Sequence, residues 1–497
     1  MSIPPARTLT PDPSPAPSLP PSPGEGKKKQ QFLAVLPALP MWWREGFIKN
    51  LLCFSPSSPG VGGREGAGEE GRGGEGRAGD RLRRWTRILS AYFSTQTVVQ
   101  LTGIAAGLLF VNFMPVREFA LYTLAFSVIT FFNFITDLGS STSLVYFFRR
   151  TAQEGEEFQP YFQAVLSLRR AVFLLGAAGV LVAFPRLAAA KGYGFAEALL
   201  VTGGIVLCVW FQIASTLRIL TLRLDDRYGA SYRAELAGGL TRLLLAALLV
   251  VSALLKSWLG VLASAAGSAA VTVLARPAKA ASSPAPALWS YQRKVLRYLL
   301  PTLPSALYFA VQGPLTVWLA ATFGVTRNIA EVGALGRLGL IVGIFSSLTG
   351  VVFLPRLARI TDDRLYRRRV GQFGASLAAV ALAMLAAAAI APDLFLLLVG
   401  KNYAGLHREL LLVVAGAGVA LLDGYLVSVN FARSWTRWQI LAVASLAAVQ
   451  AVLIALLPLS TTAGVLVFNL LSGTAALATQ LAIVMLGFAR PQWVQWK

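Results

Sequence analysis

Residues 119–148 read FALYTLAFSVITFFNFITDLGSSTSLVYFF, a stretch of thirty residues that contains one formal charge, Asp137. Charged residues, among them Arg117 and Arg150, lie just outside it. A bilayer core about 30 Å thick needs roughly 20 predominantly apolar residues in a helix. The stretch exceeds that length and contains no proline, so it predicts one long, tilted transmembrane helix.

The composition of the whole chain also indicates a membrane protein. Of the 497 residues, 55% are hydrophobic and only 14% are charged, and the mean hydropathy is +0.61. Such a chain is too apolar for an ordinary soluble protein. The formal net charge is +22, but the basic residues lie in short segments between apolar runs rather than on one soluble domain, which argues against nucleic-acid binding.

Few residues could carry chemistry. Cys53 and Cys208 provide no disulfide framework, and the single histidine, His407, has no partner for a metal site. No G-x-x-x-x-G-K-[ST] motif for ATP occurs in the sequence. We therefore expect no metal, no cofactor and no enzymatic activity, and any work would be driven by a gradient or by another subunit.

Residues 1–80 hold 13 Pro and 13 Gly. This composition cannot bury enough apolar surface to offset the chain entropy, so it predicts a disordered tail. After this tail, apolar windows of spanning length follow one another at short intervals. They predict twelve transmembrane helices, at residues 92–113, 119–148, 162–184, 195–217, 234–255, 258–274, 299–323, 331–354, 370–390, 410–429, 439–459 and 462–488.

The basic residues between these spans predict the topology. If the amino terminus is cytoplasmic, the inward segments hold 27 Lys and Arg residues and the outward segments hold seven. This alternation is the positive-inside pattern of twelve helices with both termini in the cytoplasm. Losing the sixth span, residues 258–274, which is short and rich in Ala, Ser and Gly, would destroy the alternation.

The order of the spans indicates two halves of six helices. Because six is even, both halves enter the membrane in one orientation and form a parallel repeat, with a central cavity and a substrate path between them. Local matches agree: Glu118 corresponds to Glu331 and Gln100 to Gln312. The expected organisation is an N-terminal half at 81–275, a cytoplasmic linker at 276–298, a C-terminal half at 299–490 and a cytoplasmic tail at 491–497.

Three segments carry a family resemblance. MPVREFALYTLAFSV at residues 114–128 resembles the segment that joins the first two helices of bacterial polysaccharide exporters. These are lipid-linked oligosaccharide flippases of the superfamily that also contains the multidrug and toxin extrusion transporters. YLLPTLPS at 298–305 resembles the start of their seventh helix, and PDLFLLLVGKNY at 392–403 the turn between their ninth and tenth helices. The resemblance covers about residues 85–490.

The resemblance implies a flippase for polysaccharide biosynthesis, including that of lipopolysaccharide. Such a protein moves an undecaprenyl-diphosphate-linked saccharide across the bacterial cytoplasmic membrane by alternating access, and an H⁺ or Na⁺ gradient could be coupled to it. A second possibility is a multidrug-type, ion-coupled antiporter of the same fold, which would need acidic residues in its cavity. A third is a membrane-embedded saccharide polymerase or ligase, which would need a sizeable outward loop, and every outward loop here is short.

A passage for a sugar diphosphate needs cations for the phosphates. Ionisable residues within spans are costly and are therefore functional candidates. Arg242 lies roughly 12 Å from the inner end of its span, and Arg337 about two turns from the outer end. Each either lines the cavity or snorkels to the interface. Arg169 and Arg218, near the inner ends of their spans, either attract diphosphate headgroups or anchor helices to anionic lipid.

Acidic and amide side chains complete the candidates. Asp423 lies about 20 Å into its span, where it is either an ion-coupling site or the partner of a neighbouring arginine. Asp137 is either a second ion-coupling site or an interfacial carboxylate near Arg149 or Arg150. Gln100 and Gln312 either line the cavity or hydrogen-bond between helices.

Overall fold

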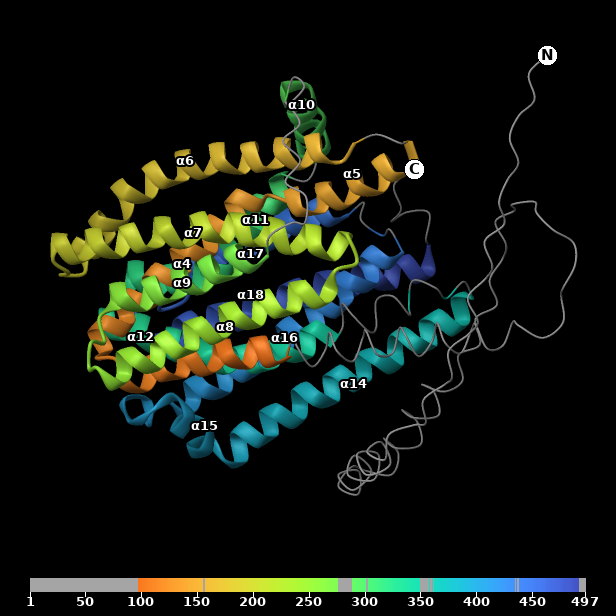
Figure 1. The fold of residues 1–497 in the computed structure, drawn as a ribbon. Coiled ribbons are helices and arrows are strands. Elements are labelled where there is room, and N and C mark those ends of the chain that lie inside the picture. The colour runs from red at the N-terminus through yellow and green to blue at the C-terminus, as the bar shows by residue number, and fades with distance from the viewer. Residues whose placement is uncertain are drawn as a thin grey trace, which may run out of the picture. The chain divides into compact units, whose positions relative to one another are not determined.

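The structure of the chain is a computed structural model (Figure 1). It describes residues 97–154, 157–275, 288–300, 303–348, 362–433 and 438–490, together with Leu357, Ile360 and Trp435. The predicted tail at 1–80, most of the predicted linker and the last seven residues lie outside the described residues. The described residues form helices and the turns between them, and no strand occurs among them.

The helices follow one another with short connections. The first described helix, Thr97–Phe113, has no label in Figure 1 and is called the first helix here. It is followed by α4 (Val116–Asp137), α5 (Ser140–Glu154), α6 (Gln159–Ala190), α7 (Phe195–Leu224), α8 (Tyr228–Val251), α9 (Ser257–Leu274), α10 (Leu288–Leu299), α11 (Leu303–Phe323), α12 (Thr326–Leu348), α14 (Asp363–Ile390), α15 (Pro392–Val399), the 3₁₀ turn η4 (Lys401–Tyr403), α16 (His407–Ala432), α17 (Gln439–Leu456) and α18 (Thr462–Ala489).

Each predicted span overlaps one of these helices, but the second span is interrupted. Helix α4 ends at Asp137, and the next two residues, Leu138 and Gly139, have positive φ angles of 39° and 81°. The Asp137 carboxylate then accepts hydrogen bonds from the backbone N–H of Ser141, at 3.3 Å, and from its hydroxyl, at 2.7 Å. The break arises because Asp and Ser side chains compete for backbone groups and glycine tolerates the left-handed conformation.

The predicted linker also contains a helix that the sequence analysis did not anticipate. Helix α10 buries Val295 and Leu299 and packs against α6 and α5. The Gln292 side chain donates a hydrogen bond of 2.7 Å to the Ser167 hydroxyl of α6. Its apolar residues recur at helical spacing between polar ones, which is the pattern of an amphipathic surface helix rather than of an extended linker.

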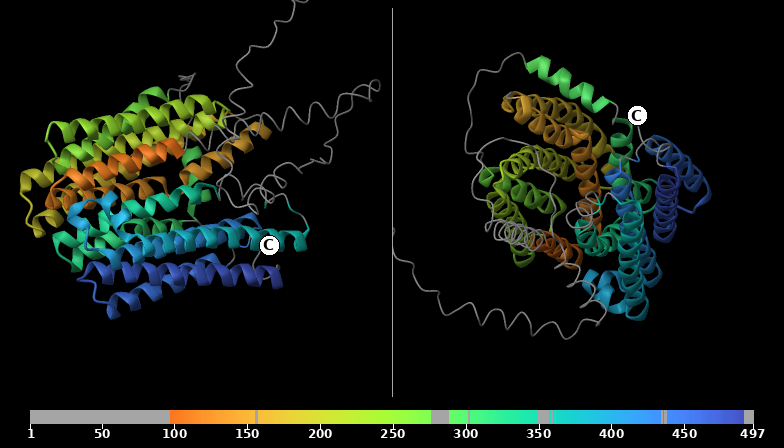
Figure 2. Two further views of the ribbon diagram at one scale, coloured as in Figure 1. Left: turned by 90° about the horizontal axis from the view of Figure 1, so that it is seen from below. Right: turned by 90° about the vertical axis from the view of Figure 1, so that its right-hand side faces the viewer.

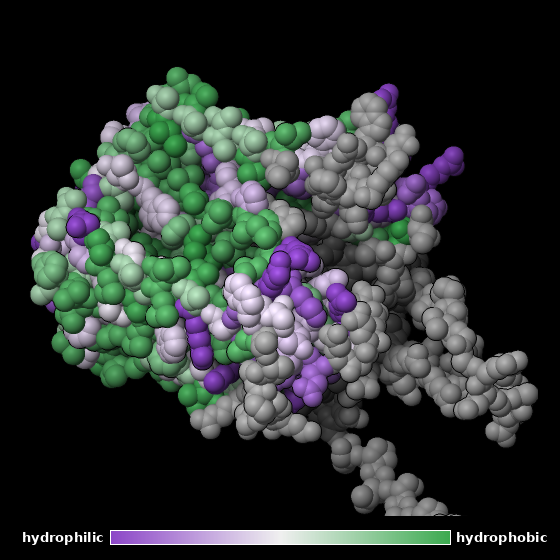
Figure 3. Space-filling model, turned by 90° about the horizontal axis from the view of Figure 1, so that it is seen from above, coloured by the Kyte–Doolittle hydropathy of each residue, from purple (hydrophilic) through white to green (hydrophobic). Residues whose placement is uncertain are grey.

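The chain is a multi-pass membrane protein. Within the part of the chain that the structure describes, nine helices are long and apolar enough to cross a membrane, and two shorter apolar helices accompany them. Large hydrophobic side chains lie on the outer surface of these helices, including Leu175 on α6 at 78% exposure and Leu248 on α8 at 60%. Figure 3 shows that hydrophobic residues dominate the face seen there. Such a surface requires lipid around it.

The helices pack as two sets with the same internal pattern. In the N-terminal set, from the first helix to α9, helix α7 packs on α9, α8 on α9, α6 on α7 and α4 on α7. In the C-terminal set, from α11 to α18, helix α16 packs on α18, α17 on α18, α14 on α16 and α12 on α16. The two sets meet where α4 packs against α11 and α12, and the right-hand view of Figure 2 shows one set beside the other.

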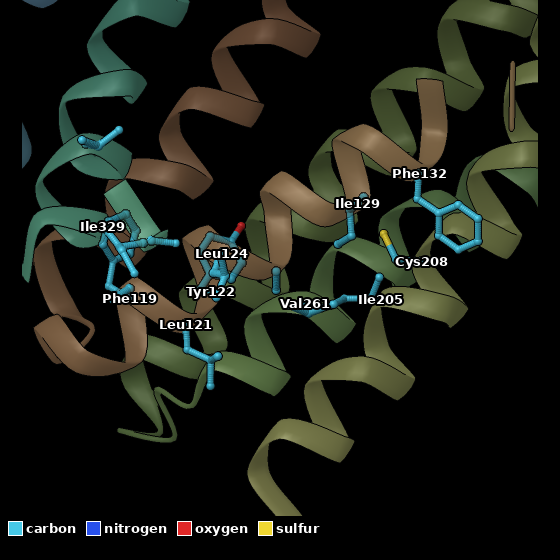
Figure 4. Close-up of a cluster of buried hydrophobic side chains, with 14 of the residues drawn as sticks. Phe119, Leu121, Tyr122, Leu124, Ile129, Phe132, Ile205, Cys208, Val261 and Ile329 are labelled. Atoms are coloured by element: carbon cyan, nitrogen blue, oxygen red, sulfur yellow. The ribbon is translucent and has the colours of Figure 1, made fainter. Parts of the chain in front are cut away.

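A buried hydrophobic cluster holds α4 in place. Phe119, Leu121 and Leu124 of α4 are fully buried, and they share one cluster with Ile205 of α7 and Ile329 of α12, as Figure 4 shows. Helix α4 therefore packs into both sets. At its crossing with α12, a Cβ atom on Gly333 would lie 2.4 Å from a side-chain atom of Thr123, so the two backbones approach closely at that glycine.

Candidate functional site

Arg337 projects from α12 of the C-terminal set toward the N-terminal set. Its guanidinium carbon lies 5.0 Å from the ring centre of Phe126 and 5.8 Å from that of Tyr122, both on α4. A Cβ atom on Gly107 of the first helix would lie 3.2 Å from Arg337 Cδ. Aromatic faces attract a cation at this range. The half-buried side chain thus lies where the two sets meet.

Arg242 of α8 reaches the same helix from the N-terminal set. A Cβ atom on Gly103 would lie 2.5 Å from Arg242 Nη2, so the end of the Arg242 side chain packs closely against the first helix at this glycine. The Arg242 Nε atom is buried and has no hydrogen-bond acceptor among the described residues. Arg242 is half-buried, and its neighbour on α9 is Gly267, another residue without a side chain.

The two arginines therefore meet the first helix about one turn apart. Gly103 and Gly107 are four residues apart, which corresponds to about 6 Å along a helix. Neither Arg242 nor Arg337 forms an ion pair with any carboxylate of the described residues. The buried Arg242 Nε atom, which has no acceptor among the described residues, is unfavourable unless water or an anionic ligand satisfies it.

Asp137 and Arg169, in contrast to Arg242 and Arg337, form an ion pair with each other. Arg169 of α6 is only 2% exposed and forms an ion pair with Asp137. It also donates hydrogen bonds of 2.7 Å to the hydroxyls of Ser140 and Ser141. Arg149 and Arg150 lie closer in sequence, yet the partner of Asp137 is Arg169, because the break after α4 turns the carboxylate toward α6.

The other predicted site residues of this group, Arg218, Gln312 and Gln100, lie on α7, α11 and the first helix. The Arg218 guanidinium donates to the backbone carbonyl of Thr272 near the end of α9. Gln312 of α11 donates to the Tyr308 hydroxyl and, at 2.8 Å, to Oε1 of Gln450 on α17. Gln100, on the first helix, is half-buried.

Asp423 of α16 has an incomplete set of partners. Its Oδ1 atom is buried and accepts no hydrogen bond from the described residues. The carboxylate lies within electrostatic range of the Tyr308 hydroxyl, which itself donates to Gln450 at 3.2 Å. Asp423 therefore lies within electrostatic range of the polar cluster of Tyr308, Gln312 and Gln450, and no arginine of the described residues forms an ion pair with it.

A pocket of about 490 Å³ opens within the N-terminal set and reaches Arg242. Its wall includes an ion pair between Arg223 of α7 and Glu235 of α8, at 2.7 Å. By its place in the sequence, Arg223 is one of the basic residues predicted at the cytoplasmic side, and no pattern singles out Glu235. Their pairing required knowledge of how α7 and α8 face each other. No group of His, Cys, Asp or Glu side chains in the described ranges could hold a metal ion.

Comparison with known proteins places the fold. No protein-family model and no curated protein matches the sequence. Among solved structures, the chain is similar to a lipid II flippase MurJ in an inward closed conformation, with a TM-score of 0.64 and 12% identity over 80% of this chain and 87% of that one. It is also similar to a Vibrio cholerae MATE transporter, with a TM-score of 0.55 and 13% identity over 80% of this chain and 97% of that one.

A eukaryotic MATE transporter gives a TM-score of 0.51 and 13% identity over 81% of this chain and 96% of its own length. At these identities the likeness concerns the fold alone. The chain has the fold of these three structures, and this is the fold that the resemblance of residues 114–128, 298–305 and 392–403 predicts.

Proposed function

We propose that the chain moves an undecaprenyl-diphosphate-linked saccharide from the cytoplasmic to the outer leaflet of a bacterial cytoplasmic membrane. The observation that carries this proposal is the meeting of Arg242 and Arg337, from different sets of helices, at neighbouring glycines of the first helix. A diphosphate supplies the acceptor oxygens that these guanidinium groups lack, and arginine binds phosphate with two parallel hydrogen bonds. The prenyl chain would remain in the lipid.

In this proposal the protein has twelve transmembrane helices in two six-helix halves, with both termini cytoplasmic. The equal packing pattern of the two sets supports the repeat. The predicted match of Glu118 with Glu331 supports it further. Glu118 accepts a hydrogen bond of 2.8 Å from the Ser257 N–H at the start of α9, and Glu331 accepts one of 2.6 Å from the Thr462 hydroxyl at the start of α18.

Transport by alternating access requires the two halves to separate at one face while they close at the other. Two hydrogen bonds join the sets at the ends that the topology assigns to the outside. Asn112 donates to the Leu398 carbonyl at 2.8 Å, and the Lys191 ammonium group donates to the Gly324 carbonyl at 2.8 Å. The described conformation is thus held closed at the outer face, which suits loading from the cytoplasmic leaflet.

Asp423 is the residue we assign to coupling with an H⁺ or Na⁺ gradient. A buried carboxylate oxygen without a donor can take up a proton or a cation at small structural cost, and nearby amide oxygens could share a cation. Asp137 is less suited to this role because Arg169 already neutralises it. Arg169 and Asp137 would instead hold the break between α4 and α5.

A second candidate function is an ion-coupled multidrug antiporter of the same fold. The unpaired Asp423 favours it, because a cationic drug needs a carboxylate in the cavity. The arginines at the first helix disfavour it, because two uncompensated cations repel such a drug. The substrate assay therefore includes both kinds of substrate.

The proposal is tested in liposomes that contain the purified protein. The substrate is undecaprenyl-diphosphate-linked N-acetylglucosamine in the inner leaflet, and its arrival in the outer leaflet is measured by accessibility to an added lectin. We expect translocation without lengthening of the glycan, and a loss of at least about a hundredfold when Arg242→Gln and Arg337→Gln are combined, since two charge-assisted contacts of about 1.5–3 kcal/mol each disappear.

Arg408→Gln serves as the matched control, because Arg408 is an exposed arginine at the start of α16. It should leave translocation unchanged. A lengthened glycan would point to a polymerase or ligase. Uptake of a cationic dye with no movement of the lipid-linked sugar would contradict the proposal and favour the antiporter.

A further inference from the structure

The pocket within the N-terminal set lies between α7, α8 and α9 and borders the first helix. Its volume of about 490 Å³ lies within the usual range for small-molecule sites. Its lining is unusually polar for the interior of a membrane protein. Charged and hydroxyl side chains gather there, and those that matter here are Ser215, Thr216, Glu235, Arg242, Ser264 and Ser268.

Two side chains that line this pocket carry unsatisfied atoms of opposite character. Glu235 and Arg242 are seven residues apart on α8, so they share one face of the helix and lie about 10 Å apart along its axis. The Glu235 Oε2 atom is buried and has no hydrogen-bond donor among the described residues, and the Arg242 Nε atom is buried and has no acceptor. Such groups cost free energy unless a ligand or water satisfies them.

The hydroxyl groups that line the pocket act as hydrogen-bond acceptors. Ser215, Thr216, Ser264 and Ser268 each donate a hydrogen bond to a backbone carbonyl of their own helix, at 2.8–3.3 Å. Their oxygen atoms can then only accept hydrogen bonds from another molecule. A ligand that fits must therefore carry several hydroxyl donors along its length and an anionic acceptor at the end near Arg242.

A sugar ring with a phosphate on its anomeric oxygen meets these requirements. We infer that the pocket binds the first sugar of the lipid-linked saccharide, with its phosphate at Arg242 and one of its hydroxyls donating to Glu235. This inference rests on the proposed function. It assigns the sugar next to the diphosphate to a site inside the N-terminal set, while the rest of the glycan occupies the space between the two sets.

The geometry gives Arg242 a double role. On one side its guanidinium touches Gly103 of the first helix, one turn from the place where Arg337 meets Gly107, and on the other side it lines the pocket. Arg223 holds Glu235 by its Oε1 atom, so that Oε2 remains available to a sugar hydroxyl. The ion pair thus positions the carboxylate, and the diphosphate lies where the pocket and the boundary between the sets meet.

The test compares the binding affinity of two short-chain prenyl probes for the full-length protein in nanodiscs. One is farnesyl diphosphate, and the other is farnesyl diphosphate linked to N-acetylglucosamine. We expect the wild type to bind the sugar-bearing probe about tenfold more tightly than farnesyl diphosphate. Glu235→Gln should remove most of that difference while it leaves the affinity for farnesyl diphosphate unchanged.

Ser268→Leu provides a second variant, because it fills the pocket without removing a charge. It should also abolish the advantage of the sugar-bearing probe. Ser376→Leu on the exposed face of α14, whose hydroxyl likewise bonds to its own helix, should retain that advantage. Melting temperatures of all variants show whether each remains folded.

Three outcomes separate the inference from the proposed function. A wild type that binds both probes equally, or folded Glu235→Gln and Ser268→Leu variants that keep the full difference, would overturn the sugar site and leave the diphosphate site standing. A wild type that binds neither probe would overturn both. Binding of N-acetylglucosamine 1-phosphate alone, lost in Ser268→Leu, would support the pocket directly.

Discussion

Arg169 and Arg337 are both arginines within the membrane-spanning bundle, but their surroundings differ. Arg169 is only 2% exposed and is fully engaged with Asp137, Ser140 and Ser141. Arg337 is half-buried, lies against the rings of Tyr122 and Phe126 and near Gly107, and forms no ion pair with a carboxylate of the described residues. The more deeply buried arginine is thus the one that already has its anion. Burial alone therefore does not identify a ligand-binding cation, and the proposed role of Arg337 rests on its lack of an ion-pair partner among the described residues.

Removal of the anion from the Arg169 pair should have the largest effect on stability. Asp137→Asn would leave the Arg169 guanidinium buried without a carboxylate, and breaking a buried pair in this way costs about 3 kcal/mol. We expect a clear drop in the midpoint of denaturant-induced unfolding in detergent. Translocation per folded molecule should change little.

Arg242→Gln is the comparison for that experiment. Arg242 has no carboxylate partner to lose, so the free energy of unfolding should stay within about 0.5 kcal/mol of the wild type, while translocation falls. If Asp137→Asn left stability unchanged, or if Arg242→Gln destabilised the protein as strongly, the division between paired and unpaired arginines would be wrong.

Arg337→Lys refines the comparison by keeping the charge. Lysine lacks the planar fork that binds two phosphate oxygens and stacks on aromatic rings. We expect a loss of about tenfold in translocation, or about 1.4 kcal/mol, with unchanged stability. Arg408→Lys on the exposed start of α16 should have no effect. A rate equal to that of the wild type would mean that Arg337 acts only as a distant charge.

The sequence predicted the helices and the matched glutamates better than the partners of the charges. Apolar length and basic residues locate the spans. Local sequence alone also matches Glu118 with Glu331, and each of them accepts a hydrogen bond at the start of a later helix. Asp137 was expected to lie near Arg149 or Arg150, but Arg169 lies across a helix break. Such pairings depend on helix rotation and on turns, which periodicity does not specify.

The contacts at Gly103 and Gly107 also depend on helix rotation, because nothing in the residue pattern indicates that Arg242 and Arg337 face the first helix. Local spacing says which residues share a face of one helix. It does not say which face of a neighbouring helix they meet. The pocket between Glu235 and Arg242 could have been suspected from their spacing of seven residues on α8, but its hydroxyl lining comes from α7 and α9.

Substitution of the two glycines should have the smallest effect, and it tests how closely the arginines must fit. In Gly103→Ala the new methyl group would lie 2.5 Å from Arg242 Nη2, so the flexible end of that side chain has to move. We expect translocation to fall about threefold, or ~0.7 kcal/mol, as for a weakened hydrogen bond.

In Gly107→Ala the nearest atom, Arg337 Cδ, lies 3.2 Å away, and a loss of less than about twofold should follow. Alanine favours a helix over glycine by about 1 kcal/mol, so stability should not fall in either variant. Gly203→Ala on α7, where a Cβ atom meets nothing within 4 Å, should match the wild type in translocation, and an equal loss at all three positions would show that the arginines are not placed by the glycines.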